Sequence, residues 1–485
     1  MLFNSWPFVI LVLLTALIYY NAGRTESRQI QILIVASLVF YGYGQLALLS
    51  LLVTSIVINA ICSFEIDRLT SPVARKTWAV AGVLANLLIL AAFKYGDLLA
   101  NSFATDPQAA GGISAWLLQL PLPIGISFYT FQGISLLADT FSGDFKKQNA
   151  TQSRGRHFRN TFFFISFFPQ LVAGPVLKAK QFIPQICHKR WADVNYDAVF
   201  HCLVTGYFLK IVVADNLKDQ TFWIQFPYFQ HISGIELLTL LVAFSAQIFA
   251  DFAGYSLIAI GVAALLGYEL PRNFKFPYIS RSISEFWRRW HISLSSWLRE
   301  YLYFPLGGNR KGSKRTYINL IIVMFLGGLW HGAAWSFAIW GLWHGFGLAL
   351  ERAAVAYRES RLENKASFAE PSDEPKSGAV RSVLQGLSVF LFVTFGWLLF
   401  ELTDISEAIL FLNSMANNMT ESPSLARLLI CTILVLPVVI YHSLYLLDRH
   451  NSCRVRAAEP WLYAFMLFLL IVNAGSSEAF VYFQF

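Results

Sequence analysis

A long run of residues carries no Asp, Glu, Lys or Arg: TYINLIIVMFLGGLWHGAAWSFAIWGLWHGFGLAL, at 316–350. A membrane-spanning helix needs about 20 consecutive apolar residues, so this run is long enough for two membrane segments. His331 lies well inside the run, in the sequence GGLWHG. The run therefore predicts membrane segments that carry an ionisable ring at depth.

The same composition extends along the whole chain of 485 residues, of which 56% are hydrophobic and only 14% are charged. An ordinary soluble domain has roughly a quarter of its residues charged. Other charge-free runs lie at 1–23, 29–64, 107–138 and 160–177, and further apolar segments lie at 77–93, 198–214, 237–268, 382–400, 428–447 and 460–477. We predict an all-α polytopic membrane protein with about 11 to 13 membrane segments, re-entrant or interfacial helices included.

Basic loops indicate the orientation of the chain, because loops rich in Lys and Arg stay cytoplasmic. Arg24 and Arg28 follow the first apolar run and no cation precedes it, which is the reverse of a secretion signal. The strongest marker is 272–315, where ten Lys or Arg and two Glu (10 − 2 = 8) account for the net charge of +8. A charge this local indicates contact with anionic lipid rather than with nucleic acid. We predict that the N- and C-termini both lie outside the cytoplasm.

We predict one membrane domain over residues 1–485, with its core at about 120–350 and C-terminal spans at 382–485. A polar segment at 351–381 has six acids and six bases and is predicted to be a linker. Residues 271–315 alternate aromatic and cationic side chains without reaching a full span, which indicates an interfacial or re-entrant segment. Prolines and glycines also break two apolar runs, near Pro123 and near Pro169. Such broken backbone at membrane depth must be shielded by protein or line a cavity.

His331 is the strongest candidate for chemistry. An ionisable group at membrane depth is functional by default, and an imidazole can take the proton from a hydroxyl during acyl transfer. The flanking glycines would let a substrate approach closely. The alternative is a structural histidine that hydrogen-bonds a neighbouring helix. The chain has no G-x-S-x-G nucleophile elbow, Walker loop or H-E-x-x-H zinc helix, and we expect no metal site.

Other charged residues could support chemistry at the cytoplasmic side. His291 lies in RRWHIS on the basic segment, and an interfacial histidine without a role is the alternative. Arg281, Arg288, Arg289 and Arg299 would attract an anionic acyl donor, such as a coenzyme A or a phosphopantetheine-bearing carrier. The same arginines would also attract lipid headgroups.

Four further ionisable groups have mainly structural interpretations. Asp251 lies inside an apolar run and needs a cationic or hydrogen-bonding partner, so a structural role is favoured. His344 follows His331 by 13 positions, or about 220° around a continuous helix, and is therefore predicted to face elsewhere and pack. His188 and Asp193 match the H-x-x-x-x-D spacing of soluble glycerolipid acyltransferases, but they lie in a charged stretch and are treated as a chance match.

Several motifs together carry a resemblance to a known family. The specific ones are SISEFWRRWHISLS at 282–295, LGGNR at 306–310 and GLWHG at 328–332; shorter ones are LPIGISF at 122–128, FFPQLVAGP at 167–175, ADNL at 214–217, DFAGYS at 251–256 and VYFQF at 481–485. In this order and spacing they resemble the membrane-bound O-acyltransferase (MBOAT) family. The resembling branch is bacterial and contains the alginate O-acetyltransferase membrane subunit and the D-alanyl transfer protein of teichoic acid synthesis. The resemblance covers nearly the whole chain.

The resemblance implies an MBOAT-like fold with a central funnel or tunnel. His331 matches the presumed catalytic histidine of the family, and His291 matches a second functionally important position. Contacts to substrate or donor would come from other residues in or beside these motifs, namely Trp290, Trp330, Arg288, Arg289, Asn309, Asp251 and Tyr255.

The implied function is transfer of an acyl group from a cytoplasmic thioester across the bacterial inner membrane. Acetyl is the expected acyl group, for O-acetylation of an exported polysaccharide such as alginate or cellulose. No cofactor is expected to stay bound, and the donor would be acetyl-CoA or another phosphopantetheine thioester. The expected partner is an exported, periplasmic hydrolase-like acyltransferase, with contacts to a polysaccharide synthase or export complex as a further expectation. The alternatives are D-alanyl transfer to teichoic acid and a non-enzymatic carrier of polysaccharide or lipid-linked sugar.

Overall fold

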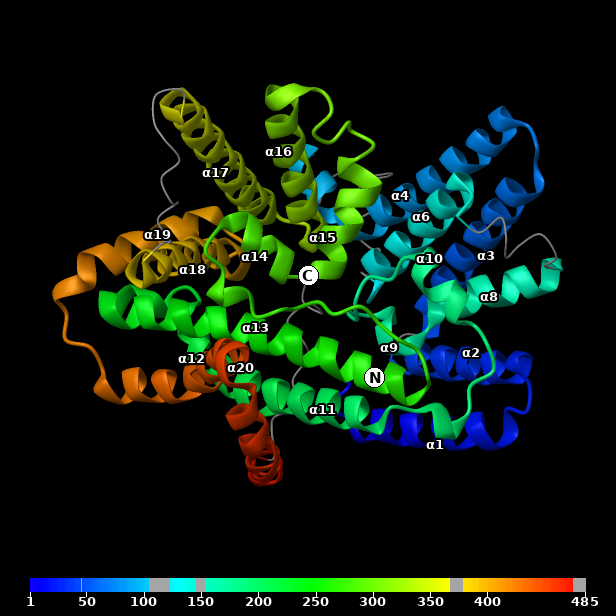
Figure 1. Ribbon diagram of the computed structural model, residues 1–485, viewed down its shortest axis with the longest axis horizontal. Helices are drawn as coiled ribbons and strands as arrows, with labels where there is room; N and C mark the ends of the chain where they lie inside the picture. Colours follow the sequence, from blue (N-terminus) through cyan, green and yellow to red (C-terminus); the bar gives the residue numbers. More distant parts are fainter. Residues whose placement is uncertain (45, 104–122, 145–152, 367–377, 474–485) are drawn as a thin grey trace. The chain divides into compact units, whose positions relative to one another are not determined.

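The structure of the protein is a computed structural model that describes residues 1–44, 46–103, 123–144, 153–366 and 378–473. Over these residues all regular structure is helical, with eighteen α-helices and no strand (Figure 1). Six helical segments are long and apolar enough to cross a membrane: Leu46–Arg68, Pro72–Gly96, Tyr196–Ile224, Gly234–Leu265, Val380–Glu401 and Leu425–Asp448. The predicted all-α, multi-pass membrane fold is confirmed. The count of 11 to 13 segments stays a prediction, because 104–122 and the chain's ending, with the motif at 481–485, lie outside the described residues.

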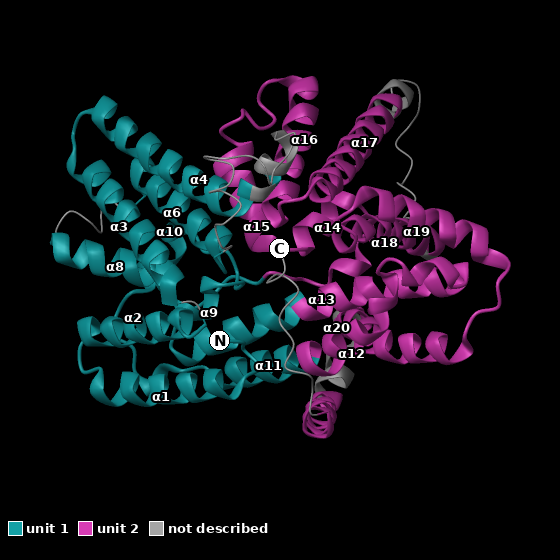
Figure 2. Cartoon of the chain, turned by 180° about the vertical axis from the view of Figure 1, so that it is seen from behind, with its two compact units in different colours: residues 1–208, 252–272, 476–485 teal, residues 209–251, 273–475 magenta. Residues whose placement is uncertain are grey.

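The chain divides into two compact units (Figure 2). Unit 1 contains residues 1–208 and 252–272, and unit 2 contains 209–251 and 273–475. The helices of unit 1 are α1 (Trp6–Ala22), α2 (Glu26–Gly42), α3 (Leu46–Arg68), α4 (Pro72–Phe103), α6 (Ile126–Ser142), α8 (Arg154–Ser166), α9 (Phe168–Leu171), α10 (Ala179–Phe182) and α11 (Tyr196–Tyr207). Those of unit 2 are α12 (Asp215–Thr221), α14 (Ile283–Arg289), α15 (Ile292–Leu298), α16 (Gly312–His331), α17 (Trp335–Ala366), α18 (Ala379–Glu401), α19 (Ile405–Asn417) and α20 (Leu425–Val472). Helix α13 (Gly234–Leu265) contributes to both units, and the single domain over the whole chain stays a prediction.

Unit 1 contains the two predicted breaks in apolar sequence. Gly125, with φ +80°, precedes α6, and a Cβ atom there would lie 2.8 Å from the carbonyl oxygen of Leu171. Glycine suits both the left-handed backbone and this close approach. The short helix α9 then ends at Leu171, and residues 172–178 are irregular yet buried. As predicted, the broken backbone is shielded by protein.

Helices α16 and α17 form a hairpin in unit 2, and they lie side by side (Figure 1). Glycines bring the two backbones together: a Cβ atom on Gly328 would lie 2.2 Å from the carbonyl oxygen of Phe337, and one on Gly341 would lie 2.3 Å from that of Met324. Small residues are the usual means of close helix packing in membranes. The hairpin fixes the end of α16, where His331 lies, against the start of α17.

The polar segment predicted to be a linker is helical over its first half. Helix α17 continues to Ala366, so 351–366 belong to it, and 367–377 lie outside the described residues. The sequence ERAAVAYRESRLENKA is polar but rich in Ala, Arg, Glu and Leu, which are strong helix formers. Polarity marked solvent exposure here, not the end of the helix.

We predict that Gly341→Ala lowers the free energy of unfolding by about 2 kcal/mol, because the new methyl group must push the α16 backbone away. Thermal unfolding of the detergent-solubilised protein measures the effect. The matched control is Gly155→Ala on α8, where nothing lies within 4 Å of an added Cβ atom and stability should be unchanged or slightly raised. Equal midpoints for Gly341→Ala and wild type would contradict close helix packing at this position.

Candidate active site

The basic segment after α13 folds into two short helices with a sharp turn between them. Ser282 caps α14 by accepting a hydrogen bond of 3.0 Å from the backbone N–H of Glu285. The carboxylate of Glu351, on α17, accepts from the backbone N–H groups of Ile283 and Ser284 and so ties the start of α14 to α17. Its two α-helices are only seven residues each, too short to span a membrane, and the interfacial or re-entrant placement stays a prediction.

His291 forms the turn between α14 and α15. Its φ of 43° is in the left-handed region, which costs most residues roughly 1–2 kcal/mol. Histidine is found in this region more often than most other residues are. The turn is held by Asn273, whose carbonyl oxygen accepts from Ile292 N–H at 2.9 Å and whose side-chain oxygen accepts from the Ser293 hydroxyl at 2.5 Å. The side chain is fully buried at 0% exposure. His291 is therefore an ordered part of the interior, not a surface histidine.

His331 is the last residue of α16, and the chain turns directly after it. A Cβ atom on Gly332 would lie 2.1 Å from the ring of Phe337, so glycine is required for this turn into α17. The imidazole is 4% exposed and is surrounded by the rings of Trp330, Trp340 and Phe400, with centroids at 5.1, 5.2 and 5.3 Å. This aromatic wall restricts access to the ring from several directions.

The structure brings the two predicted histidines together. Their ring centroids are 6.2 Å apart, although the residues are forty positions apart in the chain. Burial lowers the pKa of His291, which lies outside the six candidate spans, to about 3. The imidazole of His291 is thus neutral at physiological pH and adds no positive charge next to His331.

A cavity of about 460 Å³ opens onto His331. Apolar side chains make most of its wall, and these are Trp287, Ile292, Leu294, Leu298, Leu320, Val323, Met324, Trp340 and Leu348. Arg288, Arg299 and Arg352 also line it, and none of the described acidic side chains does. The cavity therefore suits a narrow apolar chain that carries anionic groups at one end.

Polar side chains also line the His331 cavity. Arg299 and Tyr303 lie on a π-helical turn (Arg299–Tyr303) that follows α15, and such turns are frequent at functional sites. The Tyr303 hydroxyl donates to the side-chain oxygen of Asn309. That bond leaves the amide nitrogen of Asn309 as the group able to donate to a ligand.

Five of the other predicted site residues fall into three groups in the structure. Arg288 and Asn309 line the His331 cavity. Trp290 and Trp330 are buried packing residues, at 1% and 4% exposure, and Trp290 stacks on Phe286. Arg289 does not line the cavity; it pairs with Glu285 at 2.8 Å and donates to the carbonyl oxygen of Lys275.

Asp251 belongs to a buried ion cluster, as its structural interpretation requires. The ammonium group of Lys210, on a π-helical turn before α12, lies 2.8 Å from Asp251 and 2.7 Å from Asp215. Tyr255 lies in unit 1, where its ring stacks on Phe3 at 4.2 Å. Neither residue lines the His331 cavity.

The chance match at His188 and Asp193 has a structural explanation. Asp193 pairs with Arg190 at 3.0 Å, and His188 lies 3.2 Å from the carbonyl oxygen of Gly23. These two interactions occupy the two side chains of the H-x-x-x-x-D pattern.

Residues that the sequence analysis did not single out complete the site, namely Tyr303, Trp340, Arg352 and Phe400. Trp340, Leu348 and Arg352 are spaced by eight and four residues on α17 and line one cavity, so helical periodicity continued past Leu350 could have found Arg352. The prediction for His344 assumed a continuous helix, but α16 ends at His331. His344 is nevertheless a packing residue, buried against Trp340 with ring centroids 4.9 Å apart.

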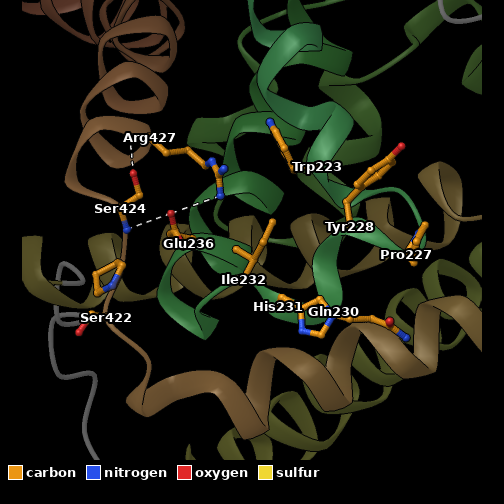
Figure 3. Close-up of a pocket in the computed structure, with 11 residues that line it drawn as sticks. Trp223, Pro227, Tyr228, Gln230, His231, Ile232, Glu236, Ser422, Ser424 and Arg427 are labelled. Atoms are coloured by element: carbon orange, nitrogen blue, oxygen red, sulfur yellow. Dashed lines mark hydrogen bonds and ion pairs between the residues drawn. The ribbon is translucent and has the colours of Figure 1, made fainter.

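A different open cavity of about 590 Å³ lies near the starts of α13 and α20 (Figure 3). Glu236 pairs there with Arg427 at 3.3 Å and accepts from the backbone N–H of Ser424 at 3.0 Å. Arg427 in turn lies over the ring of Trp223. These contacts tie α20 to α13, and none of the predicted site residues lines this cavity.

We predict that Lys210→Met destabilises the protein by about 3–5 kcal/mol, because it leaves two buried carboxylates without their shared ammonium. Asp251→Asn keeps the Lys210–Asp215 pair and should cost less. Thermal unfolding in detergent gives the order of the two variants, with Arg190→Met at an exposed ion pair as the control. A Lys210→Met midpoint equal to the control's would show that the cluster contributes nothing to stability.

Comparison with known proteins places these features in a family. Residues 29–365 match the family model of MBOAT, the membrane-bound O-acyltransferase family. The chain is 36% identical over 414 residues to a probable alginate O-acetylase AlgI of Pseudomonas aeruginosa, covering 84% of this chain and 73% of the relative. It is 34% identical over 403 residues to a peptidoglycan O-acetyltransferase of Helicobacter pylori (79% and 73%), and 31% identical over 233 residues to a teichoic acid D-alanyltransferase of Bacillus subtilis (46% and 56%). The chain, with its buried histidine pair and arginine-lined cavity, belongs to the membrane-bound O-acyltransferase family.

Proposed function

We propose that this O-acyltransferase moves an acetyl group from a cytoplasmic thioester donor, through the cavity at His331, for O-acetylation of an exported polysaccharide. The observation that carries the proposal is the position of His331. It lies at the wall of a cavity that has arginines for an anionic donor and apolar side chains for its arm.

His331 acts as the base in this scheme. The acceptor hydroxyl loses its proton to the imidazole as its oxygen attacks the thioester carbonyl. The carbon–sulfur bond then breaks, and the proton passes from the imidazolium to the leaving thiolate.

The charge of the cavity favours acetyl over D-alanyl. A D-alanyl group carries an ammonium, and none of the described acidic side chains lines the cavity to pair with it. Taking a charged group into a buried site without a partner is costly. An acetyl group is neutral and meets no such cost. Two of the relatives are named a probable alginate O-acetylase and a peptidoglycan O-acetyltransferase, and both names refer to acetyl transfer.

The proposed setting is the bacterial inner membrane, with 272–315 on the cytoplasmic side and both termini in the periplasm. The donor is acetyl-CoA or another phosphopantetheine thioester, and no cofactor stays bound. The proposed partner is an exported hydrolase-like acyltransferase that completes the transfer to the sugar hydroxyls, within reach of a polysaccharide synthase or export complex. The alternative of a non-enzymatic carrier has no use for a buried histidine pair.

We predict that His331→Ala lowers the ester content of the exported polysaccharide by roughly 10²-fold or more, because general base catalysis is lost. Esters are released from purified polymer and quantified in cells with matched membrane abundance of each variant. The control is His188→Ala, far in sequence from the site and bonded to Gly23. Normal esters with His331→Ala would reject this assignment, and lost polymer export would favour the carrier.

We predict that His291→Asn folds normally but transfers acetyl roughly tenfold more slowly. Asparagine tolerates the left-handed backbone, whereas the β-branched His291→Val should fail to fold. Because burial keeps the pKa of His291 at about 3, the ring is neutral above pH 4, and the pH midpoint of transfer should not move in His291→Asn. Unchanged transfer in this variant would show that His291 has no role, and a shifted midpoint would show that it titrates during the reaction.

A further inference from the structure

The open cavity of about 590 Å³ near the starts of α13 and α20, here called the α13–α20 cavity, has no part in the proposed transfer. Its volume is within the range of small-molecule sites, roughly 300–1,000 Å³. Trp223, Tyr228 and Gln230 line it from the segment before α13, and Ser422 and Ser424 line it from the segment before α20 (Figure 3). Aromatic and polar side chains from two distant parts of the sequence therefore share one cavity.

Hydrogen bonds fix the walls of the α13–α20 cavity. Glu236 is 5% exposed, and its carboxylate accepts from the backbone N–H of Ser424 at 3.0 Å and from Arg427 at 3.3 Å. The side-chain amide of Asn418 donates to the carbonyl oxygen of Gln230 at 3.0 Å. A ligand therefore meets a preformed surface, and little entropy is lost in ordering the protein around it.

The charge of this cavity differs from that of two basic cavities, the one at His331 and one of about 640 Å³ lined by Arg281 and Arg288. Arg288 lines both basic cavities. In the α13–α20 cavity, Arg427 is the only Lys or Arg among the described lining residues, and Glu236 pairs with it at 3.3 Å. Because the two charges balance, this cavity favours a neutral ligand over a phosphate or a polymer of carboxylates.

The side chains that line the α13–α20 cavity suit a sugar. Tyr228 is 45% exposed, so part of its ring is available to pack against the C–H face of a sugar ring. Gln230, His231 and Ser422 offer both donors and acceptors, which sugar hydroxyls require because each hydroxyl both donates and accepts. A lipid acyl chain would cover these polar groups without giving them hydrogen-bond partners, which is unfavourable.

The two helices that border the cavity begin on the same side of the membrane. Helix α13 contains one candidate span and is followed by the basic segment at 272–315, so its start lies on the face opposite to that segment. Helix α20 contains a candidate span at Leu425–Asp448, and three arginines at 449–456 follow it, which gives the same orientation. With the basic segment in the cytoplasm, the α13–α20 cavity opens to the periplasm.

We propose that the α13–α20 cavity binds neutral sugar residues of the exported polysaccharide and so holds the acceptor polymer at the periplasmic face of the protein. The orientation and the polymer are those of the proposed function, on which this site rests. The site names an acceptor class, a polymer of neutral sugars such as a glucan, in preference to a polyuronate such as alginate. The proposed exported acyltransferase would then meet a polymer chain that is already held at the membrane.

The test measures binding of oligosaccharides to the full-length protein in a detergent without a sugar headgroup. At least one of two neutral probes, cellohexaose and chitohexaose, should bind wild type more tightly than the polyanion hexamannuronate does. Tyr228→Ala should raise the Kd for the neutral probe roughly tenfold by removing the exposed ring, and Gln230→Ala roughly threefold by removing one hydrogen bond. The matched control is Tyr196→Ala, where the side chain is 46% exposed but does not line the cavity. Its Kd should equal that of wild type.

Three results would overturn the sugar site. The first is wild-type protein that binds neither neutral probe, or that binds hexamannuronate more tightly. The second is a Kd for the neutral probe that is the same in wild type, Tyr228→Ala and Gln230→Ala. The third is Tyr228-dependent binding of phosphatidylglycerol vesicles without binding of an oligosaccharide, because it would assign the exposed ring to the lipid surface.

The side of the membrane is tested by labelling of single cysteines in spheroplasts of cells whose copy of the protein lacks its native cysteines. Ser422 and Ser360, the latter on the polar end of α17, are both exposed. Ser422→Cys should react with a membrane-impermeant maleimide in intact spheroplasts, whereas Ser360→Cys should react only after lysis. Labelling of Ser422→Cys only after lysis would overturn a periplasmic acceptor site.

The sugar site and the proposed function fail separately in this design. Binding of an oligosaccharide does not use the base, so His331→Ala should bind the neutral probe with the wild-type Kd. Normal polysaccharide esters in His331→Ala would reject the proposed function, whatever the Kd values are. Lost esters in His331→Ala, together with Kd values that Tyr228→Ala and Gln230→Ala leave unchanged, would reject only the sugar site.

Discussion

The close approach of α16 and α17 through Gly328 and Gly341 fixes the geometry of the whole site. Since the two backbones nearly touch, the last turn of α16 cannot move without displacing α17. His331 at the end of one helix and Trp340 on the other are therefore held at a set distance. Helix α17 also carries Glu351, which accepts hydrogen bonds from the start of α14. Helix α14 leads into the turn at His291, whose ring lies 6.2 Å from that of His331. One contact between glycines thus organises elements that are far apart in the chain.

Charge is distributed so that arginines remain open to a ligand. The acids of this region are used inside the protein: Glu285 pairs with Arg289, and Glu351 caps α14. Arg288, next to Arg289 in the sequence, lines both basic cavities, and none of the described acidic side chains pairs with it. The arginines that line the basic cavities are exposed, so they are open to an anionic ligand, although water partly screens their charge. Arg281, Arg288 and Arg299 supply part of the positive charge concentrated at 272–315.

Hydrophobic runs and breakers in the sequence were sufficient to predict the all-α membrane fold and the irregular, protein-shielded backbone near Pro169. They could not show that α16 ends at His331, because the Gly332 turn lies inside an unbroken apolar run. Nor could they show that α17 continues to Ala366, since its last turns are polar. Both histidines were predicted as candidates, but their proximity of 6.2 Å depends on tertiary packing. Arg288 and Arg289 are adjacent cations, and the sequence gives no reason to assign them different roles. In the structure Arg289 pairs with Glu285, whereas Arg288 lines the cavity.

The small size of an acetyl group decides where specificity must come from. One methylene in an apolar pocket is worth only about 1–3 kcal/mol of discrimination, so contacts to the acyl group alone cannot select or hold the donor. Binding energy from the remote end of the donor can be used to place the thioester at His331. The aromatic wall of Trp330, Trp340 and Phe400 then needs only to exclude larger groups and water. In the proposed function, contacts to the donor therefore come from the arginines, and the aromatic rings limit the size of the acyl group. Neither set of side chains selects the acceptor, which is compatible with relatives that are named for different acceptor polymers.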